Sequence, residues 1–284
     1  MRLQVHSDDI GASRALLHFS GWPDAGEMIE FTLSELKSMV PLDLVAEWNL
    51  EGHWHADALR PMVHVQHGQV KKLAWPTFRF LRGRYGEMEP FLVGSGPEPS
   101  RDWSGFTADL LDILTRWGCR DIVLLGSLYD RIFHDEVVFS AVVQDARGYN
   151  QLRELGCRPA EYVGPSSIHS ALLEATRGTE MRCISIWTHL PFYLQGPHEL
   201  TSARCLEIIG SLLGFTLDPV NLRQRWEERE GDIEELIHGN HELRQAIEVL
   251  KNDRHRRKAG SPTNILRMDD FMKKRHDPRS NGGS

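Results

Sequence analysis

The stretch FSGWPDAG, residues 19–26, decides the fold that this sequence predicts. It follows an apolar run, Ala15–Phe19, with the composition of a buried strand, and it precedes Glu27–Met39, where apolar residues recur at helical spacing. A strand, a tight turn and a helix in this order form the repeating unit of α/β sheets. We therefore expect a mixed sheet that is covered by helices.

The turn itself has two explanations. Asp24 can be the N-cap of the helix with Glu27 as its capping-box partner, so that Asp24 accepts hydrogen bonds from the amides of residues 26 and 27. This explanation leaves Trp22 without a role. A turn between a strand and a helix N-terminus is also where α/β sheets bind anionic ligands. We favour the structural explanation, because caps of this kind are common.

Strands and helices alternate along most of the chain, and no internal repeat is present. His67-Gly68 between two strands predicts a hairpin turn. The other strands expected are Leu44–Trp48, Met62–Gln66, Val70–Trp75, Phe78–Arg82, Phe91–Val93, Ile122–Leu125, Val137–Val143 and Cys183–Trp187, and the other helices are Ser104–Trp117, Tyr149–Leu155, Ser167–Ala175, Leu200–Leu213 and Leu222–Leu250.

The last helical region carries an apolar stripe that can pack on its own domain or meet a partner helix. Asp218 and Pro219 are typical of a helix start, and glycines at 231 and 239 predict a kinked pair or helical hairpin. We expect an α/β domain at 1–215, a helical region at 216–251 and a basic flexible tail at 252–284. The stripe residues predicted to form an oligomer interface are Trp226, Ile233, Leu236 and Leu243.

Charge is distributed unevenly. The net charge is −7, whereas residues 251–284 hold ten Lys/Arg and four Asp/Glu, a net of +6, which leaves −13 for residues 1–250. The acidic body argues against nucleic-acid binding, because phosphates would be repelled. We expect residues from about 252 onward to be mobile or extended.

Composition limits the cellular setting and the chemistry. Membrane-spanning and signal-peptide segments are not expected, because long apolar runs are missing and acids occur near the N-terminus. Cys119, Cys157, Cys183 and Cys205 lie far apart, mostly in or beside apolar segments, so we expect buried reduced thiols in a cytoplasmic protein. We expect no metal and no cofactor.

Polar and aromatic residues follow several of the expected strands. His134 beside two carboxylates could be a general base or part of a metal cluster, although a solvated loop is the better default. The chain has no GxSxG elbow and no complete glycine-rich phosphate motif. The residues that could form one pocket at the strand ends are Trp22, Asp24, Glu98, Trp103, Asp130, His134, Tyr162, His189 and Tyr193.

Seven segments, in this order, resemble the family named for proteasome assembly chaperone 2, and most closely its bacterial members of unassigned function. They are GWPDAG (21–26), RP (60–61), WP (75–76), GPEPSRDWSGF (96–106), LLGSLYD (124–130), YVGPSSI (162–168) and SIWTHLPFY (185–193). The resemblance implies a three-layer α/β/α domain of phosphorylase/hydrolase-like type with C-terminal helices. It also implies homo-oligomers in prokaryotic members, and chaperone activity in eukaryotic and some archaeal members.

The chain departs from the family pattern in its loops and at its end. The family's Pro-His-Thr-Arg is replaced by residues 133–136, a glycine is replaced by Ser167, and a histidine is replaced by Phe192. A shared chemistry in one pocket is therefore less expected. The ending Gly282-Gly283-Ser284 also lacks the hydrophobic-Tyr-X pattern with which some relatives dock on proteasome rings.

Two function classes follow. The first is a homo-oligomeric chaperone-like or scaffold protein, with a trimer as the first guess for its assembly and a protein as its client. The alternative is an enzyme, phosphorylase/hydrolase-like or a ligase, that acts on a small anionic or nucleoside-like substrate at the strand ends. Convergence of the strand-end loops on one pocket would favour the enzyme, whereas scattered loops would favour the scaffold.

Overall fold

The computed structural model describes residues 2–55 and 57–258. Its main sheet has nine strands in the order β1-β3-β6-β7-β2-β8-β11-β9-β10. The strands are β1 (Arg2–Val5), β2 (Arg14–Ser20), β3 (Leu42–Asn49), β6 (Thr77–Gly83), β7 (Phe91–Pro97), β8 (Asp121–Asp130), β9 (Phe139–Val143), β10 (Arg158–Pro159) and β11 (Arg182–Pro191).

The centre of the sheet is parallel. β7, β2, β8 and β11 run in the same direction, so their carboxyl ends share one edge. Antiparallel pairs flank this centre on both sides: β6 joins β7, β3 joins β6, and β9 joins β11. The sheet is therefore mixed, as the alternating pattern of the sequence predicts.

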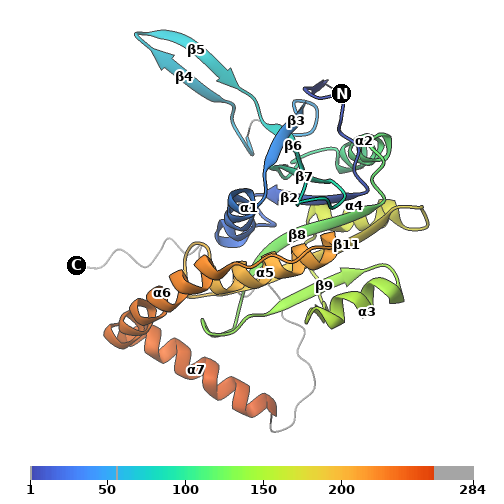
Figure 1. Ribbon diagram of the computed structural model, residues 1–284. Coiled ribbons are helices and arrows are strands. Elements are labelled where there is room, and N and C mark those ends of the chain that lie inside the picture. The colour runs from blue at the N-terminus through green and yellow to red at the C-terminus, as the bar shows by residue number, and fades with distance from the viewer. Residues whose placement is uncertain (1, 56, 259–284) are drawn as a thin grey trace.

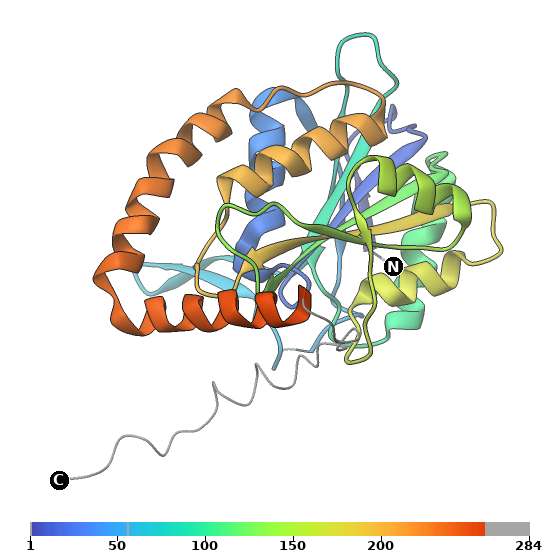
Figure 2. The ribbon, with the colours of Figure 1, turned by 90° about the horizontal axis from the view of Figure 1, so that it is seen from below.

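Helices cover both faces of the sheet (Figures 1 and 2). One apolar core joins the sheet to α1 (Met28–Met39), α3 (Ala146–Glu154) and α5 (Glu199–Leu213). A second core, rich in aromatic rings, joins the other face to α2 (Trp103–Arg116) and α4 (Ile168–Thr176). Two helical layers around one sheet confirm the predicted three-layer α/β/α class.

The C-terminal helices form a bent pair, as predicted. α6 (Val220–Gly239) packs on α5, and α7 (His241–Lys258) follows after a break at Asn240. The start of α6 differs from the expectation, because Pro219 is its N-cap and the carboxylate of Asp218 pairs with Arg223 instead. Because α7 continues to Lys258, the prediction of a mobile or extended chain from residue 252 is wrong for 252–258. The rest of that predicted tail, 259–284, lies outside the described residues.

A β-hairpin projects from the body (Figure 1). It consists of β4 (Met62–Gln66) and β5 (Gln69–Ala74), which pair only with each other in a separate two-stranded sheet. The turn residues His67 and Gly68 have φ values of 50° and 73°, which confirms the predicted hairpin turn.

Candidate functional site at the carboxyl ends of the parallel strands

Asp24 caps α1, but not through the amides that the sequence predicts. Its two carboxylate oxygens accept hydrogen bonds from the backbone N–H groups of Ile29 (2.8 Å) and Glu30 (3.1 Å), so the expected bonds from residues 26 and 27 are wrong. The reason is an extra turn, η1 (Ala25–Glu27), which precedes α1 and holds Glu27 at a φ of 54°. Glu27 makes no side-chain capping bond, so there is no capping box.

The same carboxylate is fully engaged on its other side. His18 on β2 lies 2.8 Å from Asp24 Oδ2, and the hydroxyl of Ser127 on β8 lies 2.8 Å from Oδ1. Burial alone would raise the pKa of Asp24, but the hydrogen bond and charge of His18 and the two amides outweigh it and lower the pKa. Asp24 therefore fastens the first turn to two strands, and it has no free face for a ligand.

A second polar group fastens β9, the strand that lies between β11 and the short edge strand β10. The ring of His189 on β11 lies between the Asp130 carboxylate, 2.8 Å from Nδ1, and the Ser140 hydroxyl, 2.8 Å from Nε2. The order Asp–His–Ser matches a hydrolase relay. However, Ser140 is buried within β9 and pairs with β11 and β10, whereas a nucleophile stands on an exposed turn. Nothing in the sequence FSAVV around Ser140 indicates this contact.

A third group fixes the loop after β8 beneath α6. The Tyr193 hydroxyl accepts from the His134 amide at 2.8 Å and also lies 2.9 Å from the ring Nδ1 of His134. His198 Nε2 donates to the His134 carbonyl at 2.8 Å, and the His198 ring packs on Trp226 with centroids 4.2 Å apart. Burial lowers the pKa of His198 to about 4, which keeps the ring neutral. His134 thus helps to form the surface on which α6 packs.

Glu98, Trp103 and Tyr162 also make local structural contacts. Glu98 accepts a hydrogen bond from the Ile168 amide (2.8 Å) at the start of α4, and burial raises the pKa of its carboxyl. The indole of Trp103 donates to the Pro99 carbonyl at 2.7 Å. The Tyr162 hydroxyl donates to the Pro165 carbonyl at 2.8 Å. The structure thus places these three residues in capping and turn contacts.

Trp22 differs from the others, because 42 % of it is exposed. Its ring meets Trp187 of β11 edge to face, with centroids 6.5 Å apart. Trp22 therefore presents an aromatic surface at the carboxyl edge, while Asp24 beside it faces inward.

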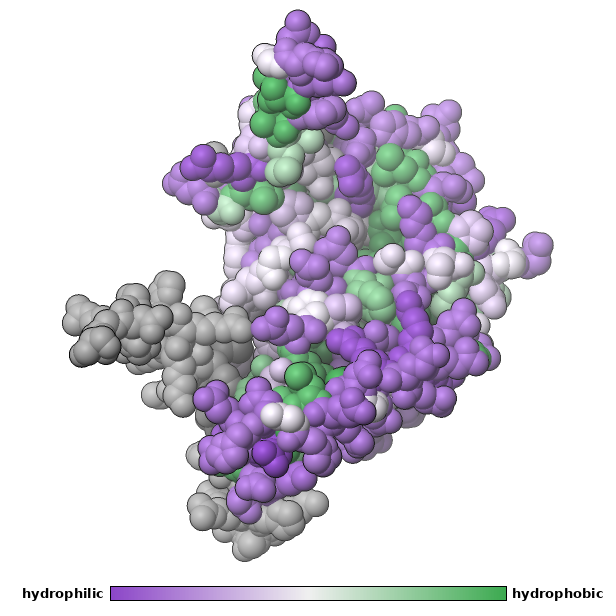
Figure 3. Space-filling model, turned by 90° about the vertical axis from the view of Figure 1, so that its left-hand side faces the viewer, coloured by the Kyte–Doolittle hydropathy of each residue, from purple (hydrophilic) through white to green (hydrophobic). Residues whose placement is uncertain are grey.

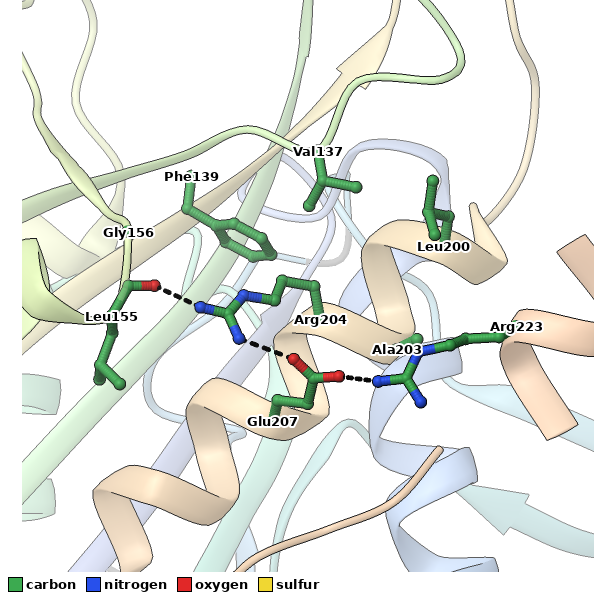
Figure 4. A pocket seen from close by; sticks show the side chains of 9 residues that line it. All are labelled: Val137, Phe139, Leu155, Gly156, Leu200, Ala203, Arg204, Glu207 and Arg223. Carbon is green, nitrogen blue, oxygen red and sulfur yellow. Dashed lines mark hydrogen bonds and ion pairs between the residues drawn. The ribbon is translucent and has the colours of Figure 1, made fainter. Parts of the chain in front are cut away.

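A cavity of about 400 Å³ lies elsewhere, between β9, α5 and the start of α6 (Figure 4). Its charged groups are paired with one another. Arg204 donates to the Leu155 carbonyl (2.9 Å) and to Glu207 (2.7 Å), and Glu207 also pairs with Arg223. None of the nine predicted pocket residues is among those that line it, which are Val137, Phe139, Leu155, Gly156, Leu200, Ala203, Arg204, Glu207 and Arg223. In the sequence, Arg204, Glu207 and Arg223 have the pattern of an ordinary solvated helix face.

The predicted site residues therefore share one edge of the sheet without converging on one pocket. They divide into separate hydrogen-bonded groups that cap helices and fasten loops. Among the described residues no cluster of three or more His, Cys, Asp or Glu could hold a metal ion, and no helix is long and apolar enough to cross a membrane. The four cysteines are buried and free, as predicted, and burial raises the pKa of Cys183 and Cys205 to about 12.

These features define a three-layer α/β/α protein whose strand-end side chains stabilise the fold. The family model described as the PAC2 family matches residues 18–237, and the chain therefore belongs to the PAC2 family. This confirms the resemblance drawn from the sequence motifs. No curated protein matches the chain.

Solved structures with the same fold come from bacteria and archaea. A proteasome-assembly chaperone homologue of Mycobacterium tuberculosis has a TM-score of 0.74 at 24% identity, over 82% of this chain and 99% of that one. A PAC2 family protein of Streptomyces avermitilis has a TM-score of 0.69 at 24% identity, with the same coverage. An archaeal proteasome activator of Pyrococcus furiosus has a TM-score of 0.63 at 16% identity, over 83% of this chain and 98% of that one.

Proposed function

We propose that this protein is a homo-oligomeric, chaperone-like scaffold of the cytoplasm that works through protein surfaces. One observation carries the proposal: the polar side chains at the carboxyl edge, where an α/β enzyme would bind its substrate, are engaged in internal hydrogen bonds. The enzyme alternative has no support, because these groups do not form one pocket with a free nucleophile, acid or base.

The proposed client is a protein, and the first candidate is a proteasome component. Membership of the PAC2 family supports this choice, as do the structural neighbours described as a proteasome-assembly chaperone homologue and an archaeal proteasome activator. The client would meet an outer surface of the molecule, because the cavity of about 400 Å³ is suited in size to a small group and its charges are already paired.

The proposed assembly is a trimer whose contacts include the helical region 216–251. Four residues were predicted for the interface. Two of them, Trp226 and Ile233, are buried within their own chain, so they hold α6 on the body and are not available to a partner. Leu236 is exposed and Leu243 is half-buried, so both are available to a neighbouring copy. Since a stable interface takes roughly 20–30 residues a side, these two leucines must be part of a larger contact.

Light scattering at micromolar concentration tests the assembly. We expect a mass near three times the 32.5 kDa of one chain. A mass of one chain that does not change on concentration would reject the homo-oligomer. Reconstitution of the proteasome from purified subunits of the same organism tests the client. The protein should raise the yield of assembled particles on native gels, and an unchanged yield would reject a proteasome client.

A further inference from the structure

The β4–β5 hairpin carries an apolar face that nothing in its own chain covers. Both strands are exposed along their whole length, and Figure 3 shows hydrophobic side chains gathered on this projection. The register places Val63 opposite Leu73 and Val65 opposite Val70. Directly opposed residues share a face, and Val63 and Val65 are two apart along β4, so these four side chains lie together; a register shift after His64 brings Val70 to the face of Leu73. His64 and Lys72 oppose each other on the other face.

A two-stranded ribbon of this kind is at best marginally stable alone in water. Exposed apolar patches rimmed by polar residues mark interaction sites, and free strand edges invite association. The hairpin adds no strand to the main sheet of its own domain, because β4 and β5 pair only with each other. Its apolar face is therefore suited to contact another molecule.

The charge of the hairpin indicates the character of that molecule. Between Ala58 and Gly86 the sequence has no Asp or Glu, although the whole chain has a net charge of −7. Lys71 and Lys72 stand on β5 itself, and Arg60 precedes β4. Contact between two identical hairpins would bring these like charges together, which opposes a symmetric hairpin-to-hairpin interface. The complementary surface must be acidic with an apolar element.

The outer side of α6 in a second copy has that character. From Glu227 to Glu235 it carries six acids and one arginine, a net of −5, and exposed Leu236 follows directly. The one arginine, Arg229, is already paired with Glu199. The acids at 227, 228, 232, 234 and 235 are exposed, so the helix presents negative charge beside an apolar side chain.

We propose that the β4–β5 hairpin of one chain packs across the outer face of α6 in the next copy. The Val63–Leu73 face covers Leu236, while the long side chains of Lys71 and Lys72, which start from the opposite side of the ribbon, reach around the edge of β5 to the acids of α6. This contact rests on the homo-oligomer proposed above and names its surfaces. Because two different patches meet, the contact is head-to-tail, and repetition closes a ring when the rotation permits it. A hairpin supplies about half of a standard interface side, so the residues at its base complete the contact.

Charge exchange tests this contact. Lys71→Glu with Lys72→Glu should weaken assembly at least tenfold, measured as the apparent dissociation constant by sedimentation equilibrium. Adding Glu228→Lys with Glu235→Lys on α6 should restore most of the lost affinity. Lys37→Glu with Arg147→Glu makes the same change of net charge at two other exposed sites, and it should leave assembly unchanged.

A second variant guards against misfolding of the mutated hairpin. Residues 62–74 are replaced by a short glycine linker, which should keep the circular dichroism and melting temperature of the body but abolish assembly. An oligomeric wild type whose mass is unaffected by both hairpin variants would overturn the hairpin contact and leave the proposed homo-oligomer standing. A monomeric wild type would overturn both. Loss of proteasome-subunit or nucleic-acid binding with unchanged mass would assign the hairpin to that partner and overturn the contact between copies.

Discussion

Two aspartates show how burial decides what a capping residue is worth. Asp24 and Asp102 both accept hydrogen bonds from backbone amides at a helix start. Asp102 is exposed, whereas Asp24 is buried and also binds His18 and Ser127. An exposed cap stabilises by about 1 kcal/mol, while each buried group left without its hydrogen-bond partner costs about 1–3 kcal/mol, and Asp24 bonds four groups. Asp102 therefore stabilises the start of its own helix, whereas Asp24 stabilises the start of α1 and also ties that helix to two strands of the sheet.

Asp24→Ala should therefore lower the free energy of unfolding by about 3 kcal/mol or more, because several buried groups lose their partner, and Asp102→Ala by about 1 kcal/mol. Urea denaturation of both variants at pH 7.5 measures the difference. Similar losses in the two variants would mean that the bonds to His18 and Ser127 contribute nothing beyond the cap.

The buried histidines make stability depend on pH. Burial lowers the pKa of His169 to about 3 and of His198 to about 4, whereas a histidine in the unfolded chain titrates near 6.5. Between those values the unfolded chain binds more protons than the folded chain. Stability should therefore fall as the pH drops from about 6.5 to about 4, at up to about 1.4 kcal/mol per pH unit for each histidine.

His198→Gln should reduce the steepness of that fall between pH 6 and 4.5, because Gln does not titrate. Urea unfolding at several pH values gives the slope for the variant and for the wild type. His241→Gln, which removes an exposed histidine, is the matched control and should keep the wild-type slope. Equal slopes in all three proteins would contradict the neutral buried state of His198.

At the scale of elements, α6 is held by three buried apolar side chains, Leu222, Trp226 and Ile233, of which the indole of Trp226 is the largest. Trp226 is 4% exposed and packs on His198, which in turn holds the loop that carries His134. Salt bridges from Arg225 to Glu35 and from Arg229 to Glu199 flank this indole. Since surface ion pairs contribute little, the buried side chains carry most of the attachment, and the ring of Trp226 is the largest of them.

Trp226→Ala should cost about 3–5 kcal/mol of local stability and free α6 from the body, while the sheet domain stays folded. Limited trypsin digestion should then cut at the arginines of α6 much faster than in the wild type. Val249→Ala, at an exposed position on α7, should digest like the wild type. Unchanged digestion of Trp226→Ala would show that other contacts hold α6.

The elements were more predictable than the site, and the reason is the range of the interactions. Apolar periodicity is local, so the main strands and helices followed from it, and the break between α6 and α7 followed from the glycine at 239. β1 has four residues and β10 has two, so both are too short to show such a signal. The His189–Ser140 bond joins strands 49 residues apart, and a single sequence gives no sign of it. The cap at Asp24 was predicted in type but not in register, because η1 inserts a turn.

At the scale of the whole molecule, charge and apolar surface are arranged to favour contact between copies. A basic hairpin projects from one end, and the outer face of α6 is acidic. Apolar residues are exposed on both, with Met62 75% and Leu236 56% exposed. Opposite charges steer two surfaces together, while apolar contact supplies the lasting part of the affinity.

The proposed assembly should therefore weaken with salt without disappearing. The screening length falls from about 10 Å at 0.1 M to about 3 Å at 1 M ionic strength, so the pairing of Lys71 and Lys72 with α6 is reduced, while the apolar contact of Val63, Leu73 and Leu236 persists. Sedimentation equilibrium in 50 mM and 500 mM NaCl should show a clear rise in the dissociation constant. The Lys71→Glu/Lys72→Glu variant should show the opposite trend, because salt screens its repulsion from α6. Tighter assembly of the wild type at high salt would mean that the contact between copies is apolar alone and that the charges of the hairpin serve another partner.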